Sequence, residues 1–165
     1  MLRSLLFLST ALVSALGVGS AQATVRIERS DLQGPRAMSE QTRAAVIRDY
    51  LQSWQSMRGA LEQNRPDLLD SSFIGTARDK LAETIGQQAA LGIKTNYRDL
   101  AHDIQLVFYS PDGLSIELKD KVEYDVEVLD HDKVKTTQHI ISLYLIVLTP
   151  AEVQWRVRVL QAAAE

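Results

Sequence analysis

The spacing of apolar residues changes from a helical period to a strand period near residue 104, and this change constrains the fold more than any other feature. Up to about residue 91, apolar side chains recur at steps of three and four residues, which is typical of helices with one buried face. From Ile104 onward they alternate with polar residues. A block of helices followed by a block of strands predicts the α+β class, with helices packed on one face of an antiparallel sheet.

The first half of the chain predicts one long helix. Ser39 is a good N-cap, and Pro66 disfavours helix at the residue before it, so the helix should end near Asn64. One face of this helix carries a stripe of apolar residues, namely Ile47, Tyr50, Leu51, Trp54, Met57 and Leu61.

Two further helices are expected before the strands. A short one spans residues 66–71, and a longer one spans residues 74–91 and ends at Gly92, which suits a left-handed C-cap. Residues 93–101 show neither period and are predicted to be irregular.

The second half predicts five antiparallel strands in a meander. A strongly twisted antiparallel sheet curls, so this sheet should wrap its apolar face around the first and third helices. The expected strands are residues 104–109, 114–119, 122–128, 134–148 and 153–159.

This pattern resembles the NTF2-like superfamily, the cone-shaped α+β domains that include SnoaL-like and steroid-isomerase-like proteins. The resemblance covers most of residues 39–162 and implies helices in the concave face of a curved sheet, a pocket at the open end of the cone and frequent dimers. It also implies that enzymatic activity is optional, because many members are not enzymes. The matching features are Tyr50 and Trp54, the segment Phe73-Ile74-Gly75, the turn Pro111-Asp112-Gly113 and the final hairpin from Tyr144 to Val157.

The amino-terminal segment has the three parts of a secretory signal. Arg3 precedes an apolar stretch from Leu5 to Val18, and Ala21-Gln22-Ala23 is a cleavage site of the A-x-A type. We expect cleavage after Ala23 and a periplasmic or secreted protein, the alternative being an uncleaved membrane anchor. The remainder would comprise a flexible leader over residues 24–38 and one domain over residues 39–165.

Composition and motifs exclude several classes of function. There is no cysteine, so thiol chemistry and disulfides are excluded. The net charge of −3 and the lack of a basic cluster argue against binding to nucleic acid. The sequence contains no G-x-S-x-G, no glycine-rich phosphate loop and no HExxH. Three scattered histidines share no ligand spacing, so no metal site and no cofactor are predicted.

Acid–base candidates are few. Along residues 122–128 the inward positions are apolar except for the Tyr124 hydroxyl, while the intervening carboxylates face outward. His102 and Asp103 precede the first expected strand and form either a catalytic pair at the mouth of the cone or an exposed loop dyad. The candidate catalytic residues are therefore His102, Asp103 and Tyr124, and the sequence predicts no ionisable pair inside the cone.

The aromatic residues fall on stripes that face the core. They are either ordinary core packing or the lining of a pocket for a small apolar ligand. The set comprises Tyr50, Trp54, Phe73, Phe108, Tyr124, Tyr144 and Trp155.

The strand over residues 140–148 is apolar on both faces. Its outward residues should not stay in water as one patch, so either a second copy of the chain or the leader is expected to cover them. These interface residues are Ile141, Leu143, Leu145 and Val147.

Two classes of function follow. The first is an exported non-catalytic domain that binds a small apolar ligand or a protein partner, or that serves as a structural subunit. The alternative is a small lyase, isomerase or hydrolase of the SnoaL-like type, which would need His102, Asp103 or Tyr124 to converge within hydrogen-bond reach.

Overall fold

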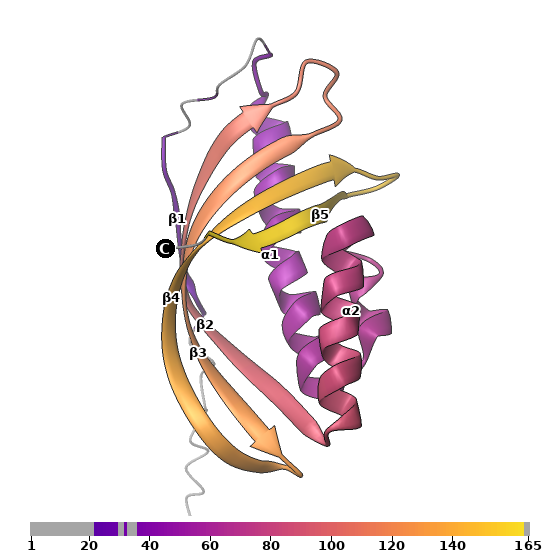
Figure 1. Cartoon of the computed structure of the whole chain (residues 1–165). Coiled ribbons are helices and arrows are strands. Elements are labelled where there is room, and N and C mark those ends of the chain that lie inside the picture. Colours follow the sequence, from indigo (N-terminus) through magenta and orange to yellow (C-terminus); the bar gives the residue numbers. More distant parts are fainter. Residues whose placement is uncertain (1–21, 30–31, 33–35, 164–165) are drawn as a thin grey trace, which may run out of the picture.

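A computed structural model describes residues 22–29, 32 and 36–163, and it has the α+β architecture expected from the sequence (Figure 1). The predicted signal segment, residues 1–21, lies outside the described residues. The elements in chain order are β1 (Thr24–Ile27), α1 (Glu40–Gln63), the 3-10 helix η1 (Pro66–Leu69), α2 (Gly75–Ala90), β2 (Ile93–Tyr109), β3 (Ile116–Asp130), β4 (Lys133–Pro150) and β5 (Trp155–Ala162).

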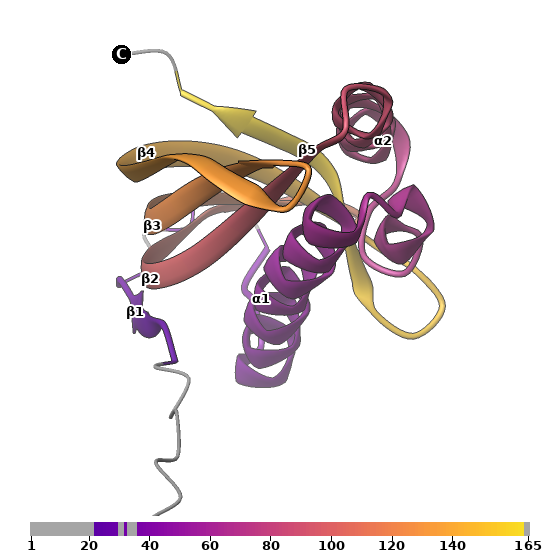
Figure 2. The same cartoon turned by 90° about the horizontal axis from the view of Figure 1, so that it is seen from below.

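The five strands form one curved sheet in the order β1-β2-β3-β4-β5. β2 to β5 are an antiparallel meander, whereas β1 pairs with β2 in parallel. Figures 1 and 2 show α1 and α2 lying side by side on the concave face of this sheet. Within the described part of the chain, neither helix has the length and apolar character needed to span a membrane.

The sheet is longer than the sequence predicts. Residues 93–101, expected to be irregular, form the first half of β2, and they pair with β3 from Ile93 opposite Asp130 onward. The expected strands 114–119 and 122–128 form the single strand β3, in which Asp120 does not interrupt the ladder. Pairing along a neighbouring strand overrides weak local patterning here, since strand propensity depends strongly on context.

The amino-terminal leader is part of the sheet for four residues. Thr24 to Ile27 pair with Ala101 to Ile104, and the Glu28 amide donates to the Ile104 carbonyl at 2.9 Å. These four residues belong to the stretch that the sequence assigned to a flexible leader before a domain starting at residue 39, and in the structure they form a strand. The physical reason is that the edge of β2 offers unpaired backbone donors and acceptors, which an extended segment can satisfy.

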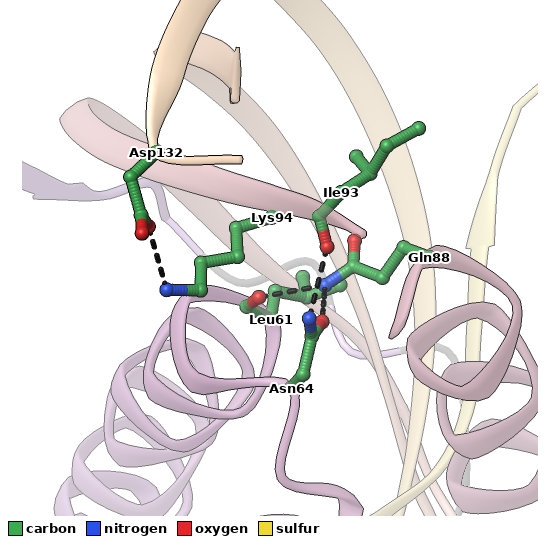
Figure 3. A network of polar contacts seen from close by, with 6 residues as sticks. All are labelled: Leu61, Asn64, Gln88, Ile93, Lys94 and Asp132. Atoms are coloured by element: carbon green, nitrogen blue, oxygen red, sulfur yellow. Dashed lines mark hydrogen bonds and ion pairs between the residues drawn. The ribbon is translucent and has the colours of Figure 1, made fainter. Parts of the chain in front are cut away.

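The ends of the helices are fixed by polar contacts. At the start of α1, the Ser39 hydroxyl accepts a bond from the Thr42 amide at 3.1 Å, which confirms the predicted N-cap. At its end, Asn64 takes a left-handed conformation, and its side-chain amide donates to the Ile93 carbonyl at 2.9 Å (Figure 3). The Gln88 side chain of α2 donates to the Leu61 carbonyl at 2.6 Å. These bonds tie α1, α2 and the start of β2 together, so the concave face is held at a fixed distance from the helices.

Candidate functional site

A histidine and an aspartate face each other inside the sheet. His102 on β2 places Nδ1 2.7 Å from Oδ2 of Asp120 on β3, and their side chains are 2% and 0% exposed. An ionised carboxylate only accepts hydrogen bonds, so the contact assigns the Nδ1 proton to the imidazole. In the neutral ring, Nε2 then keeps its lone pair and can take a proton.

Two side chains of α1 hold this pair in place. The Tyr50 hydroxyl donates to the same Asp120 Oδ2 at 2.8 Å. Burial raises the pKa of Tyr50 well above its usual value, with the Asp120 charge adding to the effect, so the hydroxyl stays protonated and continues to donate. The Trp54 ring lies edge-on to the His102 ring, with centroids 5.3 Å apart. The imidazole is therefore fixed both by its hydrogen bond and by packing.

The prediction that the cone contains no ionisable pair is wrong. His102 was expected in a loop before the first strand, but β2 begins at Ile93 and His102 takes an inward strand position. Asp103 is the next residue along β2, so its side chain points to the opposite face and does not join His102. The Tyr124 hydroxyl instead shares a hydrogen bond of 3.1 Å with the Tyr144 hydroxyl.

Sequence reasoning missed Asp120, although a signal for it was present. The inward positions of β3 have even numbers, and Ile116, Leu118, Val122 and Tyr124 are all buried. Asp120 stands at the third even position of β3, between Leu118 and Val122, and so must point inward with them. Reading the segment as two strands with a break at Asp120 hid this parity.

A cavity of about 520 Å³ adjoins the buried pair, which is within the usual size of a small-molecule site. It lies between α1, the first half of β2 and the start of β1, and charged or amide side chains make up half of its lining. The lining residues are Gln22, Ala23, Val25, Leu51, Gln55, Arg58, Tyr97, Arg98, Asp99 and His102.

A second carboxylate, Asp99, faces this cavity. Its side chain is 8% exposed, and its Oδ2 lies 3.4 Å from an Arg58 guanidinium nitrogen. Oδ1 is buried and has no hydrogen-bond partner among the described residues. Burial raises the pKa of Asp99, and the Arg58 and His102 charges only partly oppose this. A buried acid with a raised pKa and a free oxygen is suited to exchanging a proton with a ligand.

The raised pKa of Asp99 predicts how the free energy of unfolding depends on pH. Asp99 binds its proton more tightly in the folded chain, so the free energy of unfolding should fall as pH rises from about 3.9, the ordinary aspartate value, through the raised pKa. The stability difference between the wild type and Asp99→Asn should fall over the same window. Urea unfolding from pH 3.5 to 7 measures it. Asp125 provides the control, because its pKa is lowered by the hydrogen bond from His139. The corresponding difference for Asp125→Asn should have the opposite slope, and a pH-independent difference for Asp99→Asn would contradict the assignment.

The aromatic residues expected to line a pocket pack mainly into the core, and none of the seven lines this cavity. Tyr50, Trp54, Phe73 and Tyr124 are buried, and Tyr144 and Trp155 pack against the core while half-buried. Phe108 does not follow the expected stripe, since a bulge between Leu106 and Phe108 shifts the register and Tyr109 enters the core instead. That these residues contact a ligand stays a prediction.

The convex face carries the remaining predicted features. Ile141, Leu143 and Leu145 are 53%, 43% and 41% exposed, and Val147 is half-buried. His139 lies beside them, with Nδ1 2.9 Å from the Asp125 carboxylate. Among the residues that the structure describes, no group of three histidine or acidic side chains could hold a metal ion.

Comparison with known proteins supports the fold alone. No protein-family model and no curated protein matches the sequence. The chain is similar to the intermembrane-space region of the chloroplast protein ARC6, with a TM-score of 0.65 and 15% identity over 79% of this chain and 100% of that one. It is also similar to a protein of Novosphingobium aromaticivorans assigned as a scytalone dehydratase, with a TM-score of 0.52 and 13% identity over 76% of this chain and 89% of that one.

These similarities and the architecture define the class. The chain has the NTF2-like fold, a cone-shaped α+β domain with an unclosed curved sheet, as the sequence pattern predicted. Similarity at 13–15% identity carries no activity from one protein to another. Function therefore has to be argued from the His102–Asp120 pair and the cavity beside it.

Proposed function

We propose that the protein is a small lyase or isomerase that moves a proton on a polar, carbonyl-containing molecule bound in the cavity. The observation that supports this most directly is the buried His102–Asp120 pair, whose imidazole lines a cavity that also holds Asp99. Of the two classes left open by the sequence, this is the enzymatic one. It needs convergent ionisable groups, and His102 and Asp99 meet that requirement.

The roles of the residues follow from their contacts. Asp99 has a free buried oxygen and acts as the base that removes a proton next to the carbonyl. His102 delivers or takes the second proton at Nε2, while Asp120 holds the ring and stabilises its protonated form. Arg58 lines the same cavity and supplies positive charge for the oxyanion that develops on the carbonyl oxygen.

A matching chemistry appears in the name of one structural neighbour. The Novosphingobium protein is assigned as a dehydratase, and a dehydratase removes a proton and a hydroxyl group from neighbouring carbons. The proposal is compatible with that name, but it depends on the site residues of this chain.

The proposal can be tested by a proton-exchange assay that does not require the natural substrate. A panel of cyclic ketones, β-hydroxy ketones and phenolic ketones is incubated with the protein in D₂O, and deuterium entry next to the carbonyl is followed by NMR. We expect exchange above the buffer rate for at least one compound, reduced in Asp99→Asn and unchanged in His139→Gln. Exchange at the buffer rate for the whole panel, or equal exchange by Asp99→Asn, would contradict the proposal.

Binding of a small apolar ligand, the other function considered from the sequence, is less well supported. After cleavage the cavity is still lined by Arg58, Asp99, His102 and Gln55, which favour a ligand with polar atoms.

We also propose a homodimer through the convex face. The exposed apolar side chains of β4 lie in one line along the strand, and a second copy stacked on them would remove them from water. Leu143→Lys, at the middle of this line, should shift the mass measured by size exclusion with light scattering from two chains to one. Lys121→Ala, opposite Leu143 on β3, is the matched control and should stay dimeric. A wild type that is monomeric at about 100 μM would exclude this interface, because its dissociation constant would then be too high for a stable dimer.

Export is part of the proposal. The charged start, the apolar stretch and the A-x-A site of residues 1–23 support a cleaved signal and a periplasmic or secreted protein.

A further inference from the structure

The predicted cleavage site and the cavity meet at the same residues. Gln22 and Ala23, the last two residues before the expected cut, line the cavity, and Thr24, the first residue after it, begins β1. Processing would therefore change the site itself, because it removes two lining residues and creates a new chain end there.

We infer that the α-amino group of Thr24, created by cleavage after Ala23, is a component of the cavity and pairs with the Asp99 carboxylate. The inference rests on the proposed export and deepens the proposed active site. It assigns to the mature chain a cationic group that the uncut chain lacks. This group favours the ionised Asp99 carboxylate, which is the form that a base requires, so the rise in the Asp99 pKa described above belongs to the uncut chain. Each carboxylate oxygen has two lone pairs, so Oδ1 can accept a bond from the ammonium and still take a proton.

The placement of this nitrogen follows from the strand. Ala23 and Val25 both line the cavity, and the Thr24 nitrogen lies between them along the chain. This nitrogen is therefore placed at the edge of the cavity. β1 is held by its parallel register, with Thr24 opposite Ala101 and Val25 opposite His102. Asp99 stands two residues before Ala101 on the neighbouring strand, and adjacent strands lie about 4.8 Å apart. The new amino group therefore lies next to the segment of β2 that carries Asp99.

The carboxylate offers a matching acceptor. Asp99 is more than nine-tenths buried, and its Oδ1 has no partner among the described residues, while Arg58 reaches only Oδ2. A backbone amide at position 24 has one hydrogen to donate, but an ammonium has three, so it can keep a strand bond and still donate toward the cavity. A charged donor also makes a stronger hydrogen bond with a carboxylate than a neutral amide does.

The charges around the site are compatible with one more cation. Arg58 approaches from α1, and Arg98, Asp99 and His102 come from β2. Asp120 contributes a second carboxylate from β3, within hydrogen-bond distance of His102. Arg98 forms its ion pair with Asp125 on the convex side. The cations available to Asp99 are therefore Arg58 and the new amino group.

The experiment measures the amino group directly. The full chain is exported, and mature protein is purified from the periplasm. Mass spectrometry should show a chain that begins at Thr24. The rate at which acetic anhydride labels the Thr24 α-amine is then measured against pH. We expect a pKa about one unit above the ordinary value of roughly 7.7–8.0, and a return to that value in Asp99→Asn.

Asp103→Asn is the matched control, since Asp103 lies on the same strand but on its other face. It should leave the amine titration at its wild-type position. An ordinary pKa in the wild type, an unchanged value in Asp99→Asn, or a mature chain that begins at another residue would each overturn the inference. No substrate is used, so a failure of the carbonyl exchange panel leaves this result interpretable, and a failure here leaves the panel interpretable.

Discussion

Replacing Asp120 with alanine should lower the free energy of unfolding by about 2–6 kcal/mol, because two buried donors each lose their acceptor. The carboxylate accepts bonds from both His102 and Tyr50, and all three side chains are almost fully buried. Its removal leaves two buried donors without their acceptor, and it opens a small void under the sheet. Urea unfolding at fixed protein concentration measures the loss, with fluorescence of Trp54, which packs on His102, as the signal.

The control for this variant is Asp103→Ala. Asp103 lies one residue from His102 on the other face of β2, where it is half-buried and opposite Lys121. Its loss should cost less than about 1 kcal/mol, as is usual for partly exposed charges. If Asp120→Ala does not fold, Asp120→Asn is used instead, because it keeps the size of the side chain. Its loss in the free energy of unfolding should lie between the losses expected for Asp120→Ala and Asp103→Ala. A loss below 1 kcal/mol for Asp120→Ala would show that the network contributes little to the fold.

The fold was predictable because two strong periods are present in the sequence. The stripe from Ile47 to Leu61 and the alternation after Ile104 lead to the helix-then-strand order and to the concave packing observed. The caps were predictable for the same local reason, since Ser39 and Pro66 act on the residues beside them. These features depend on neighbours within a few residues along the chain.

The candidate site was only partly predictable: His102 was named from the sequence, but its burial and its partner Asp120 depend on pairing between distant segments. His102 becomes an inward residue only once Ile93 to Ala101 pair with β3, and nothing in the local pattern of that stretch indicates a strand. Asp120 interrupts an apolar stripe, which sequence reasoning took as a break and the fold uses as a buried acceptor. A polar residue at the correct parity inside an apolar stripe is thus better taken as a candidate for a buried network than as the end of a strand.

Replacing His102 with glutamine should lower the rate of proton exchange in the responding ketone by a factor of about 10²–10⁴, the usual contribution of a positioned acid or base. Glutamine can still donate a hydrogen bond toward Asp120, but its amide neither takes up nor releases a proton near neutral pH. The effect should therefore fall on catalysis more than on stability. Exchange is measured by NMR in D₂O, and the unfolding midpoint in urea is measured on the same preparation.

The comparison that decides the role of His102 uses two other variants. His139→Gln changes the same residue type on the convex face, where the imidazole contacts Asp125, and it should exchange at the wild-type rate. Tyr50→Phe removes one bond to Asp120 while keeping the His102 contact, so it should lower the rate less than His102→Gln does. If the exchange rate of folded His102→Gln stays within threefold of the wild-type rate, the imidazole takes no part in the proton transfer. The buried pair would then serve the fold, and Asp99 would be left as the only base in the cavity among the described residues.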